Sequence, residues 1–321
     1  MVRYGAYGDH IIVTPLLRLL KQEGYHVTYE VAFRGREMLR GNPYIDEFID
    51  HDETIPNDKL SGYWDELKKG YDRFVNLSGS VEEGLLAPEG SREFYLPKDE
   101  RHRRYNKNYY DYTLELAGYD VKGLRGELYF DENEENIAKA FRKKHRDKFL
   151  VVWALSGSAF HKAYPYAEYV AAAFLSKRKN AVIVTVGGEL ERIIEFNLKN
   201  TIKTCGKWSF RRSALLTKHA DLVIGGETGI MHAAGCYDTP KILMLSHSTV
   251  ENLSKYWKGC INLSPNVSCY PCHRLIYTLK PCPKDFLGEG DKLGIPICVS
   301  RLNAGDVLDA MKGVYEKWAT T

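Results

Sequence analysis

A glycine-rich turn in the second half of the chain has the residue types that bind an anion at the start of a helix. It reads GGETG over 225–229, directly after the apolar segment 221–226, and small residues follow it. A hydroxyl such as that of Thr228 can cap the helix, leaving free N–H groups and the positive end of the helix dipole facing outward. Such a helix start binds phosphate or pyrophosphate. The candidate ligands are Glu227, Thr228, Gly229 and His232, unless the turn is only structural and the histidine packs against the sheet.

A second loop of small residues follows the apolar segment 149–155. Ser156, Gly157 and Ser158 would let the backbone approach a ligand closely, and Lys162 would neutralise a phosphate. A solvated loop lysine is the alternative for this segment taken alone. The ligand-binding interpretation gains weight because an anion site is already expected in the same half of the chain.

An acidic segment reading GGELE occupies 187–191, after the apolar segment 181–187. A carboxylate at the end of such a strand can accept two hydrogen bonds from a ribose diol. Without the neighbouring motifs, an acidic first helical turn that favours the helix dipole would be the simpler explanation.

A carboxylate also stands in a glycine-rich turn at the N-terminus, where residues 5–9 read GAYGD. Asp9 would face a cleft and act as a general base on a hydroxyl. The alternative is that Asp9 only caps a helix over 10–22.

The elements that must position these motifs alternate between strand and helix. Strands are predicted at 26–33, 71–77, 149–155, 181–187, 221–226 and 241–246, and helices at 11–23, 35–40, 105–118, 131–148, 165–178, 189–199, 229–236 and 304–318. This alternation predicts doubly wound parallel sheets. A highly charged stretch at 131–148 marks a boundary between Rossmann-like domains at 1–147 and 148–303, followed by a C-terminal helix at 304–321. Ligands would bind in the cleft between the domains, at the carboxyl ends of the strands.

Composition excludes several classes of protein. Hydrophobic residues make up 44% and charged residues 27%, which is typical of a globular protein. The net charge of +3 is too small to indicate nucleic-acid binding by itself. No apolar run approaches the ~20 residues of a spanning helix, and the first ten residues lack the apolar core of a signal peptide. A cytoplasmic location is therefore predicted.

Seven cysteines lie in the second half of the chain, and an odd number in a reducing compartment argues against a disulfide framework. Four of them are close in sequence: Cys269, Cys272, Cys282 and Cys298. The CxxC pair has metal-ligand spacing, and four thiolates would suffice for a structural zinc. Buried free thiols or a redox-labile pair are the alternatives.

Taken together, these motifs resemble glycosyltransferase family 9, the heptosyltransferases of lipopolysaccharide core assembly. Five segments in the family's order carry the resemblance: RYGAYGDHIIVTPLLRLLK, YDRFVNLSGS, ALSGSAFHKAYPYAEYVAAAF, VIVTVGGELERI and CGKWSFRRSALLTKHADLVIGGETGIMHAAGCYDTPKI. The resemblance implies a GT-B fold, with a nucleotide-sugar donor in the C-terminal domain and an acceptor on the N-terminal domain. It implies an inverting transfer that needs no metal, and a final helix that packs back on the N-terminal domain.

Residue roles are also implied by the resemblance. Asp9 would deprotonate the acceptor hydroxyl, which attacks the anomeric carbon. Lys162, the helix start at Thr228 and Gly229, and His232 would hold the diphosphate and stabilise its charge as it leaves.

The ribose-binding carboxylate of the family fits Glu191 better than Glu189, by distance from the glycine pair. Two departures from the family pattern stand out. Only residues 1–4 precede the first glycine turn, which shortens the first strand, and Glu227 stands where the family commonly has Asp.

The acceptor is expected to meet a basic surface. Residues 101–112 read RHRRYNKNYYDY, and Arg34, Arg36 and Arg40 form a second basic group. Such a surface suits a polyanionic glycan or glycolipid, and basic residues interleaved with aromatics also suit nucleic acid. A solvated helix with inward-packed tyrosines is the alternative. The predicted acceptor contacts are Arg34, Arg101, Arg103 and Arg104.

Three functions stay open from the sequence. The first is transfer of a sugar, by family default heptose, from an ADP- or UDP-sugar to lipopolysaccharide core or another surface glycan, by an enzyme in the cytoplasm or at the inner face of the membrane. The second is the same chemistry on a hydroxylated base in phage-type DNA. The third is a non-catalytic nucleotide-sugar binder. The near-neutral total charge favours the saccharide acceptor over a long duplex.

Overall fold

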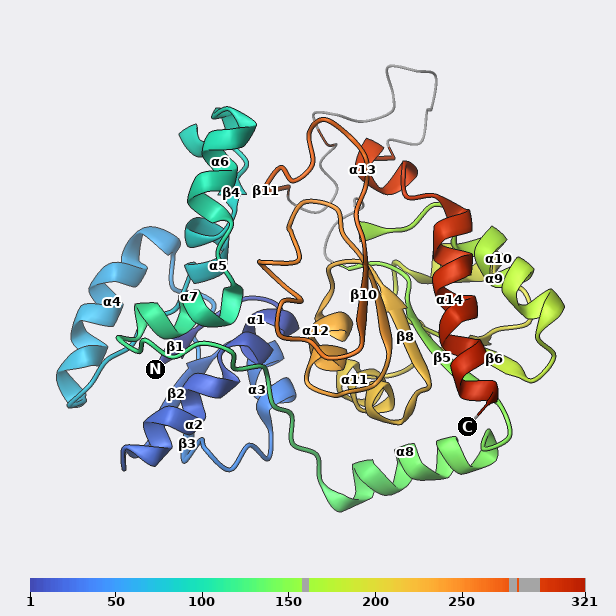
Figure 1. Cartoon of the computed structure of the whole chain (residues 1–321). Helices are drawn as coiled ribbons and strands as arrows, with labels where there is room; N and C mark the ends of the chain where they lie inside the picture. The colour runs from blue at the N-terminus through green and yellow to red at the C-terminus, as the bar shows by residue number, and fades with distance from the viewer. Residues whose placement is uncertain (158–161, 277–281, 283–294, 321) are drawn as a thin grey trace.

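The computed structural model describes residues 1–157, 162–276, 282 and 295–320 of the 321-residue chain. It has two α/β lobes, each built on a parallel sheet, with the N-terminal lobe on the left of Figure 1 and the C-terminal lobe on the right. The helix α8 (Glu132–Lys144) joins them. Its start is fixed by a capping box, in which Asp131 and Glu134 each accept a hydrogen bond from the other's backbone N–H. The two-lobed organisation predicted from the sequence is therefore present.

The N-terminal lobe has a small parallel sheet in the order β1-β2-β3. Its strands are β1 (Val2–Arg3), β2 (Thr28–Val31) and β3 (Glu47–Asp50). The strand predicted at 71–77 is not formed as a ladder. Only an isolated bridge joins Val2 to Asn76, because β1 is two residues long and leaves no further partner for that segment.

Helices surround this sheet; the helix predicted at 11–23 is interrupted after Ile12, and the helix predicted at 105–118 is formed over Tyr109–Leu116, with a separate helix before it. The helices of the N-terminal lobe are α1 (Tyr7–Ile12), α2 (Thr14–Gln22), α3 (Phe33–Leu39), α4 (Leu60–Leu67), α5 (Ser80–Gly84), α6 (Lys98–Tyr105) and α7 (Tyr109–Leu116). Short 3₁₀ turns lie at Asn57–Lys59, Lys68–Gly70 and Arg92–Tyr95. Pro15 has no N–H to continue α1 into α2. Asn108 separates α6 from α7, since its side chain accepts hydrogen bonds from the first N–H groups of α7.

The C-terminal lobe has a six-stranded parallel sheet in the order β10-β9-β8-β5-β6-β7. Its strands are β5 (Phe149–Ala154), β6 (Ala181–Val186), β7 (Ile202–Lys203), β8 (Leu222–Gly225), β9 (Lys241–Met244) and β10 (Cys260–Leu263). Its helices are α9 (Ala167–Lys177), α10 (Arg192–Asn197), α11 (Phe210–His219), α12 (Gly229–Gly235), α13 (Ile297–Ser300) and α14 (Ala304–Ala319). The central strands β5, β8 and β9 are buried along their whole length, as their continuous apolar runs predict.

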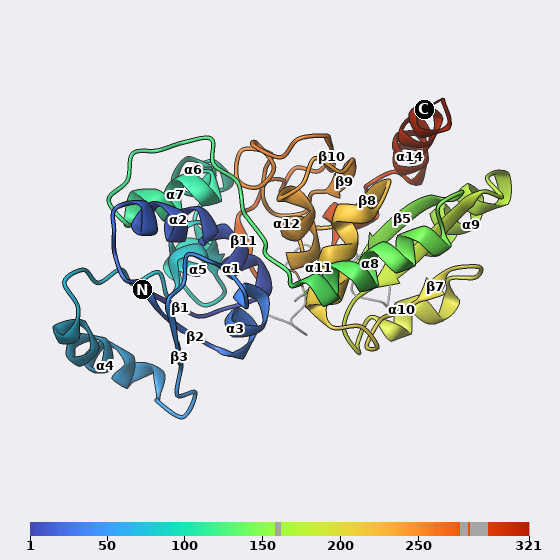
Figure 2. The ribbon, with the colours of Figure 1, turned by 90° about the horizontal axis from the view of Figure 1, so that it is seen from below.

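The final helix, α14, packs on the C-terminal lobe. Val307 and Met311 are fully buried with the residues of β5 and α9, and the rings of Tyr315 and Trp318 lie against Phe149. Figures 1 and 2 both place α14 on the side of the C-terminal sheet that faces away from the N-terminal lobe. The expectation that this helix packs back on the N-terminal domain is therefore wrong, because its apolar face packs beside α9 on one face of its own lobe's sheet.

The two lobes are also joined by a short parallel sheet on one side of the molecule. Strand β11 (Arg274–Leu275) of the C-terminal lobe pairs with β4 (Ala87–Pro88) of the N-terminal lobe. A buried apolar cluster runs across the boundary, since Ile11 and Tyr110 pack with residues of α12. The relative position of the lobes is thus held by both backbone pairing and apolar contact. Within the described residues, no helix has the length and apolar character needed to cross a membrane.

Candidate active site

A cavity of about 900 Å³ lies between the lobes. Its N-terminal wall comes from the first turn of α1, from α3 and from α5, and its C-terminal wall from the segments that follow β5, β6, β8 and β9. These segments begin at the carboxyl ends of the strands, which is where ligands bind in parallel α/β sheets. The cavity brings together motifs separated by up to about two hundred residues of sequence, as the domain arrangement predicts.

Asp9 lies in the N-terminal wall, in the first turn of α1. One carboxylate oxygen, Oδ2, accepts a hydrogen bond from the Ala6 N–H at 2.7 Å, and the other, Oδ1, lies 3.0 Å from Nη2 of Arg3. Gly5 has a φ of +125°, and a Cβ there would lie 2.7 Å from Oδ2 of Asp9. Glycine is therefore required for the turn that holds this carboxylate. Asp9 both closes the helix start and presents a partly exposed carboxylate to the cavity.

The start of α12 faces Asp9 from the C-terminal wall. Thr228 is the N-cap residue, and its hydroxyl accepts a hydrogen bond from the Met231 N–H at 3.4 Å. A Cβ at Gly229 would lie 3.3 Å from the backbone nitrogen of Gly8. The starts of α1 and α12 are thus in contact, which places the two glycine-rich turns on opposite sides of the same cavity.

Two basic side chains lie between these turns. Burial lowers the pKa of Lys162, and the negative charges of Glu227 and Asp9 partly offset this effect. Burial, with the nearby charge of Lys162, also lowers the pKa of His232 to about 4, although Asp9 acts in the opposite direction. The Nδ1 atom of His232 is buried and has no hydrogen-bond partner among the described residues. These two groups can therefore serve a polyanionic ligand that enters the cavity.

Glu227 anchors the loop after β9. It forms a buried ion pair with His247 and accepts hydrogen bonds from the Ser246 hydroxyl at 2.5 Å and the Ser248 N–H at 2.9 Å. Burial alone would raise the pKa of this carboxyl, but His247 and these hydrogen bonds outweigh it and hold the pKa far below its usual value. The carboxylate is therefore engaged by its own lobe, but Glu227 also lines the cavity, so its direct contact with the donor stays a prediction. His247 and Ser248 also line the cavity. Sequence reasoning missed them, although three polar residues, 246–248, closely follow the apolar strand β9 and could have indicated a site.

The remaining donor candidates gather at the same wall. Ser156, Gly157 and Glu191 line the cavity, whereas Ser158 lies outside the described residues. A Cβ at Gly157 would lie 3.0 Å from Thr228 and 3.2 Å from Lys162, so the small residue permits their close approach. The Oε2 atom of Glu191 accepts a hydrogen bond from the Gly188 N–H at 2.7 Å.

Only one of the four arginines predicted to contact the acceptor lines the cavity, and that residue is Arg34. Arg101 is buried, with 3% of its surface exposed, and its guanidinium donates to the carbonyl oxygens of Leu96 and Cys272. The expectation that Arg101 is available to an acceptor is therefore wrong, because it ties the segment before β11 to the N-terminal lobe. Arg103 is exposed on α6, and Arg104 pairs with Glu100 at 2.6 Å, away from the cavity.

The four C-terminal cysteines do not form a metal site within the described residues, where no three potential ligands lie close enough to hold an ion. Burial, together with the charges of Cys282 and Cys269, raises the pKa of Cys272 to about 12. Cys298 is buried, and its pKa is raised in the same way. The chain on either side of Cys282 lies outside the described residues, so a structural zinc stays a prediction.

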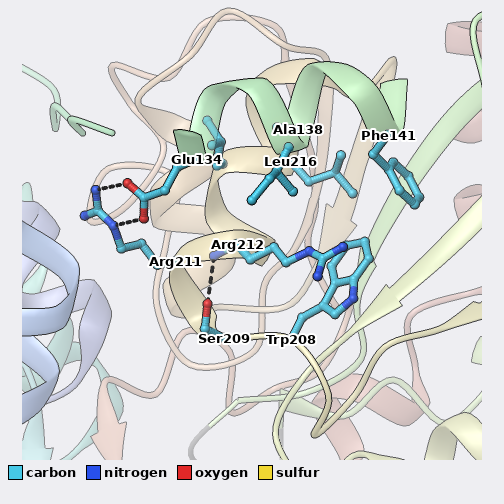
Figure 3. Close-up of a pocket in the computed structure, with 10 residues that line it drawn as sticks. Glu134, Ala138, Phe141, Trp208, Ser209, Arg211, Arg212 and Leu216 are labelled. Carbon is cyan, nitrogen blue, oxygen red and sulfur yellow. Dashed lines mark hydrogen bonds and ion pairs between the residues drawn. The ribbon is translucent and has the colours of Figure 1, made fainter. Parts of the chain in front are cut away.

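A smaller pocket of about 200 Å³ lies between α8 and α11 (Figure 3). Arg211, buried at one end of it, donates to both carboxylate oxygens of Glu134 and to the backbone oxygen of Met38 at 2.9 Å. One guanidinium thus ties together the C-terminal lobe, the connecting helix and α3. The pocket contains none of the anion-binding motifs, and its buried arginine is fully engaged in holding the lobes together.

The fold and the interlobe cavity are those of GT-B proteins, and together with a family match they define the class of protein: a two-lobed glycosyltransferase. The chain belongs to glycosyltransferase family 9 (heptosyltransferase), whose family model matches residues 97–281, more than half of the sequence. No curated protein sequence matches the chain.

Solved structures of glycosyltransferases share the fold with this chain. The glycosyl transferase family 9 protein from Veillonella parvula is 18% identical, with 98% of this chain and 96% of that chain covered and a TM-score of 0.69. The E. coli ADP-heptose LPS heptosyltransferase II is 14% identical, with 99% of each chain covered and a TM-score of 0.63. The iron-containing dodecameric glycosyltransferase TibC from E. coli is 13% identical, with 99% of this chain and 76% of that chain covered and a TM-score of 0.60.

Proposed function

We propose that this glycosyltransferase moves a sugar from a nucleoside-diphosphate sugar to a hydroxyl group, with inversion at the anomeric carbon. Heptose from ADP-heptose is the donor we favour, because a related E. coli structure is described as an ADP-heptose LPS heptosyltransferase. The observation that carries the proposal is the placement of Asp9 on one wall of the cavity and of Lys162 and His232 on the other.

In the proposed step, the N-terminal wall supplies the base and the C-terminal wall stabilises the leaving group. Asp9 takes the proton from the acceptor hydroxyl, whose oxygen forms a bond to the anomeric carbon. The bond from that carbon to the diphosphate oxygen breaks, and its electron pair leaves with the nucleoside diphosphate. Lys162 and His232, near the start of α12, stabilise the charge that develops there. Attack from the side opposite the leaving group inverts the anomeric configuration.

The ribose is proposed to lie near Glu191, whose remaining oxygen can accept a hydrogen bond from a diol. The small residues at Ser156 and Gly157 leave room for the diphosphate beside Thr228. Glu227 supports this site from behind through the loop it anchors.

The test is turnover of ADP-heptose by the wild-type protein and by Asp9→Asn. Release of ADP should fall about 10²- to 10⁴-fold in the variant, which is the usual contribution of a general base, while the affinity for ADP stays within about threefold. An NMR spectrum of the product reports the anomeric configuration. Unchanged turnover in Asp9→Asn would exclude this base, and retention of configuration would exclude direct displacement.

Thermal-shift measurements with ADP, UDP and GDP test the nucleotide separately. A ligand that binds only the native state raises its melting temperature. We expect the largest shift with ADP, and a larger shift with UDP would reassign the donor.

A further inference from the structure

A second carboxylate stands beside Asp9 on the N-terminal wall of the cavity. It belongs to Glu82, in α5, and its side chain is one-third exposed. Asp9 and Glu82 come from different elements and are joined by Arg3 of β1. The Nη1 and Nη2 atoms of Arg3 lie 3.0 and 3.3 Å from the two carboxylate oxygens of Glu82, and Nη2 also lies 3.0 Å from Asp9 Oδ1.

Arg3 is built into the fold beneath these two carboxylates. Only 1% of its side chain is exposed, and Nη1 also donates to the Leu77 carbonyl oxygen at 3.1 Å. Burial would lower the pKa of Arg3, but the charges of Asp9 and Glu82 outweigh it and raise the pKa further. The guanidinium is therefore always charged and is already shared, so it cannot reach into the cavity to bind an anion.

One guanidinium and two carboxylates leave one net negative charge at this position. Burial and the charge of Asp9 raise the pKa of Glu82, as expected for two carboxylates that share one cation. The other charged groups of the N-terminal wall are Glu37, which accepts a hydrogen bond from the Tyr7 hydroxyl at 2.5 Å, and the exposed Arg34.

Apolar and aromatic groups complete this wall: Ile12, Val81, Leu86 and Tyr109. The acceptor side is thus weakly acidic with apolar patches, and the basic helix α6 lies outside the cavity. A phosphate or carboxylate brought next to Asp9 and Glu82 would be repelled in a partly buried setting, where charges are weakly screened.

We propose that the acceptor presents an uncharged, hydroxyl-bearing face to this wall, and that Glu82 is a second acceptor-binding carboxylate. The inference rests on the proposed function, in which Asp9 takes the proton of the attacking hydroxyl. Glu82 accepts a hydrogen bond from a neighbouring hydroxyl of the same acceptor, and Arg3 holds the two carboxylates at a fixed separation. The wall therefore selects neutral polyol acceptors over phosphorylated ones.

The test compares two probes that differ by one phosphate, D-mannose and mannose 6-phosphate, on protein saturated with ADP. Binding is followed by saturation-transfer difference NMR for the wild type, Glu82→Gln and Glu82→Lys. Glu83→Gln is the matched control, because Glu83 is the exposed neighbour and does not line the cavity. We expect the wild type and the control to favour the neutral probe by at least tenfold, Glu82→Gln to reduce this ratio, and Glu82→Lys to reverse it.

Equal or tighter binding of mannose 6-phosphate by the wild type would overturn the proposal. So would a ratio that does not respond to the charge at position 82, including the absence of binding of either probe to every variant. Retained folding of each variant is checked by its melting temperature. Failure of ADP to bind, or loss of the Asp9 dependence of ADP-heptose turnover, would instead defeat the proposed function and is measured separately.

Discussion

The backbone of Gly8 in the N-terminal lobe lies directly against the imidazole of His232 in the C-terminal lobe. A Cβ built at Gly8 would lie 2.9 Å from Cδ2 of His232, closer than real Cβ atoms approach. The contact joins the turn that carries Asp9 to the helix start that faces it. Because Gly8 has no side chain, the turn that carries the proposed base can lie this close to the proposed diphosphate site.

Replacing Gly8 by alanine should impair turnover far more than stability. The added methyl must displace His232 or separate the lobes, and misplacement of catalytic groups by about 1 Å can cost about 10²-fold in rate. We expect kcat/KM for the donor to fall about 10- to 100-fold in steady-state assays. The control is Gly62→Ala, because a Cβ there meets open space. Activity of Gly8→Ala equal to that of the control would show that the lobes adjust freely.

Removing the charge of Lys162 should weaken nucleotide binding. A charged hydrogen bond to phosphate contributes about 1.5–3 kcal/mol, so Lys162→Met should raise the Kd for ADP about 10- to 150-fold by calorimetry. Lys199→Met is the matched control, since Lys199 is exposed and does not line the cavity. An unchanged Kd for Lys162→Met would remove this lysine from the diphosphate site.

Several elements of the C-terminal lobe could be predicted because local sequence and tertiary environment agree there. The apolar run at 149–155 and the turn at 225–229 specify a buried strand and a capped helix without help from distant residues. The N-terminal lobe was harder to predict. The segment 71–77 has the composition of a strand, but strand formation needs a partner, and β1 offers only Val2 for a bridge.

The fate of polar side chains was the least predictable part of the site. Glu227 was assigned to the donor from its place in the glycine-rich turn, and Arg101 was assigned to the acceptor from its basic segment. Both side chains also satisfy buried groups from segments distant in sequence, Glu227 at Ser246 to Ser248 and Arg101 at Cys272. Burying a charge demands such partners, but a sequence does not indicate which distant segment will supply them.

Arg101 should therefore matter for stability rather than for acceptor binding. Arg101→Ala removes the charged donor to two carbonyl oxygens, Leu96 and Cys272, and should lower the free energy of unfolding by about 3 kcal/mol. Arg103→Ala, on the exposed face of the same helix, should change it by less than about 0.5 kcal/mol. Urea denaturation measures both. Equal effects would mean that the buried position of Arg101 contributes nothing.

Glu227→Gln should destabilise the protein, because it removes the buried carboxylate that His247, Ser246 and Ser248 contact. The Glu227 and His247 side chains are only 3% and 8% exposed, and leaving a buried donor without its acceptor costs about 1–3 kcal/mol. A lower midpoint in urea is expected at pH 7, with a smaller loss for Ser246→Ala, which removes only one neutral donor. If the midpoint is unchanged but ADP binding is lost, Glu227 contacts the donor directly.

Binding of ADP should be coupled to uptake of a proton by His232. Its pKa in the free protein is lowered to about 4 by burial and by Lys162, so the ring is neutral at pH 7. A diphosphate placed beside it adds negative charge and raises this pKa in the complex. Between the two pKa values the complex holds more protons than the free protein, so affinity for ADP rises as pH falls toward 4.

Calorimetry at pH 5.5 in two buffers of different ionisation enthalpy counts the protons taken up when ADP binds. His232→Gln should take up fewer protons than the wild type, and the ionisation of ADP itself cancels in that difference. Identical uptake by the two proteins would show that the histidine stays neutral when the diphosphate binds.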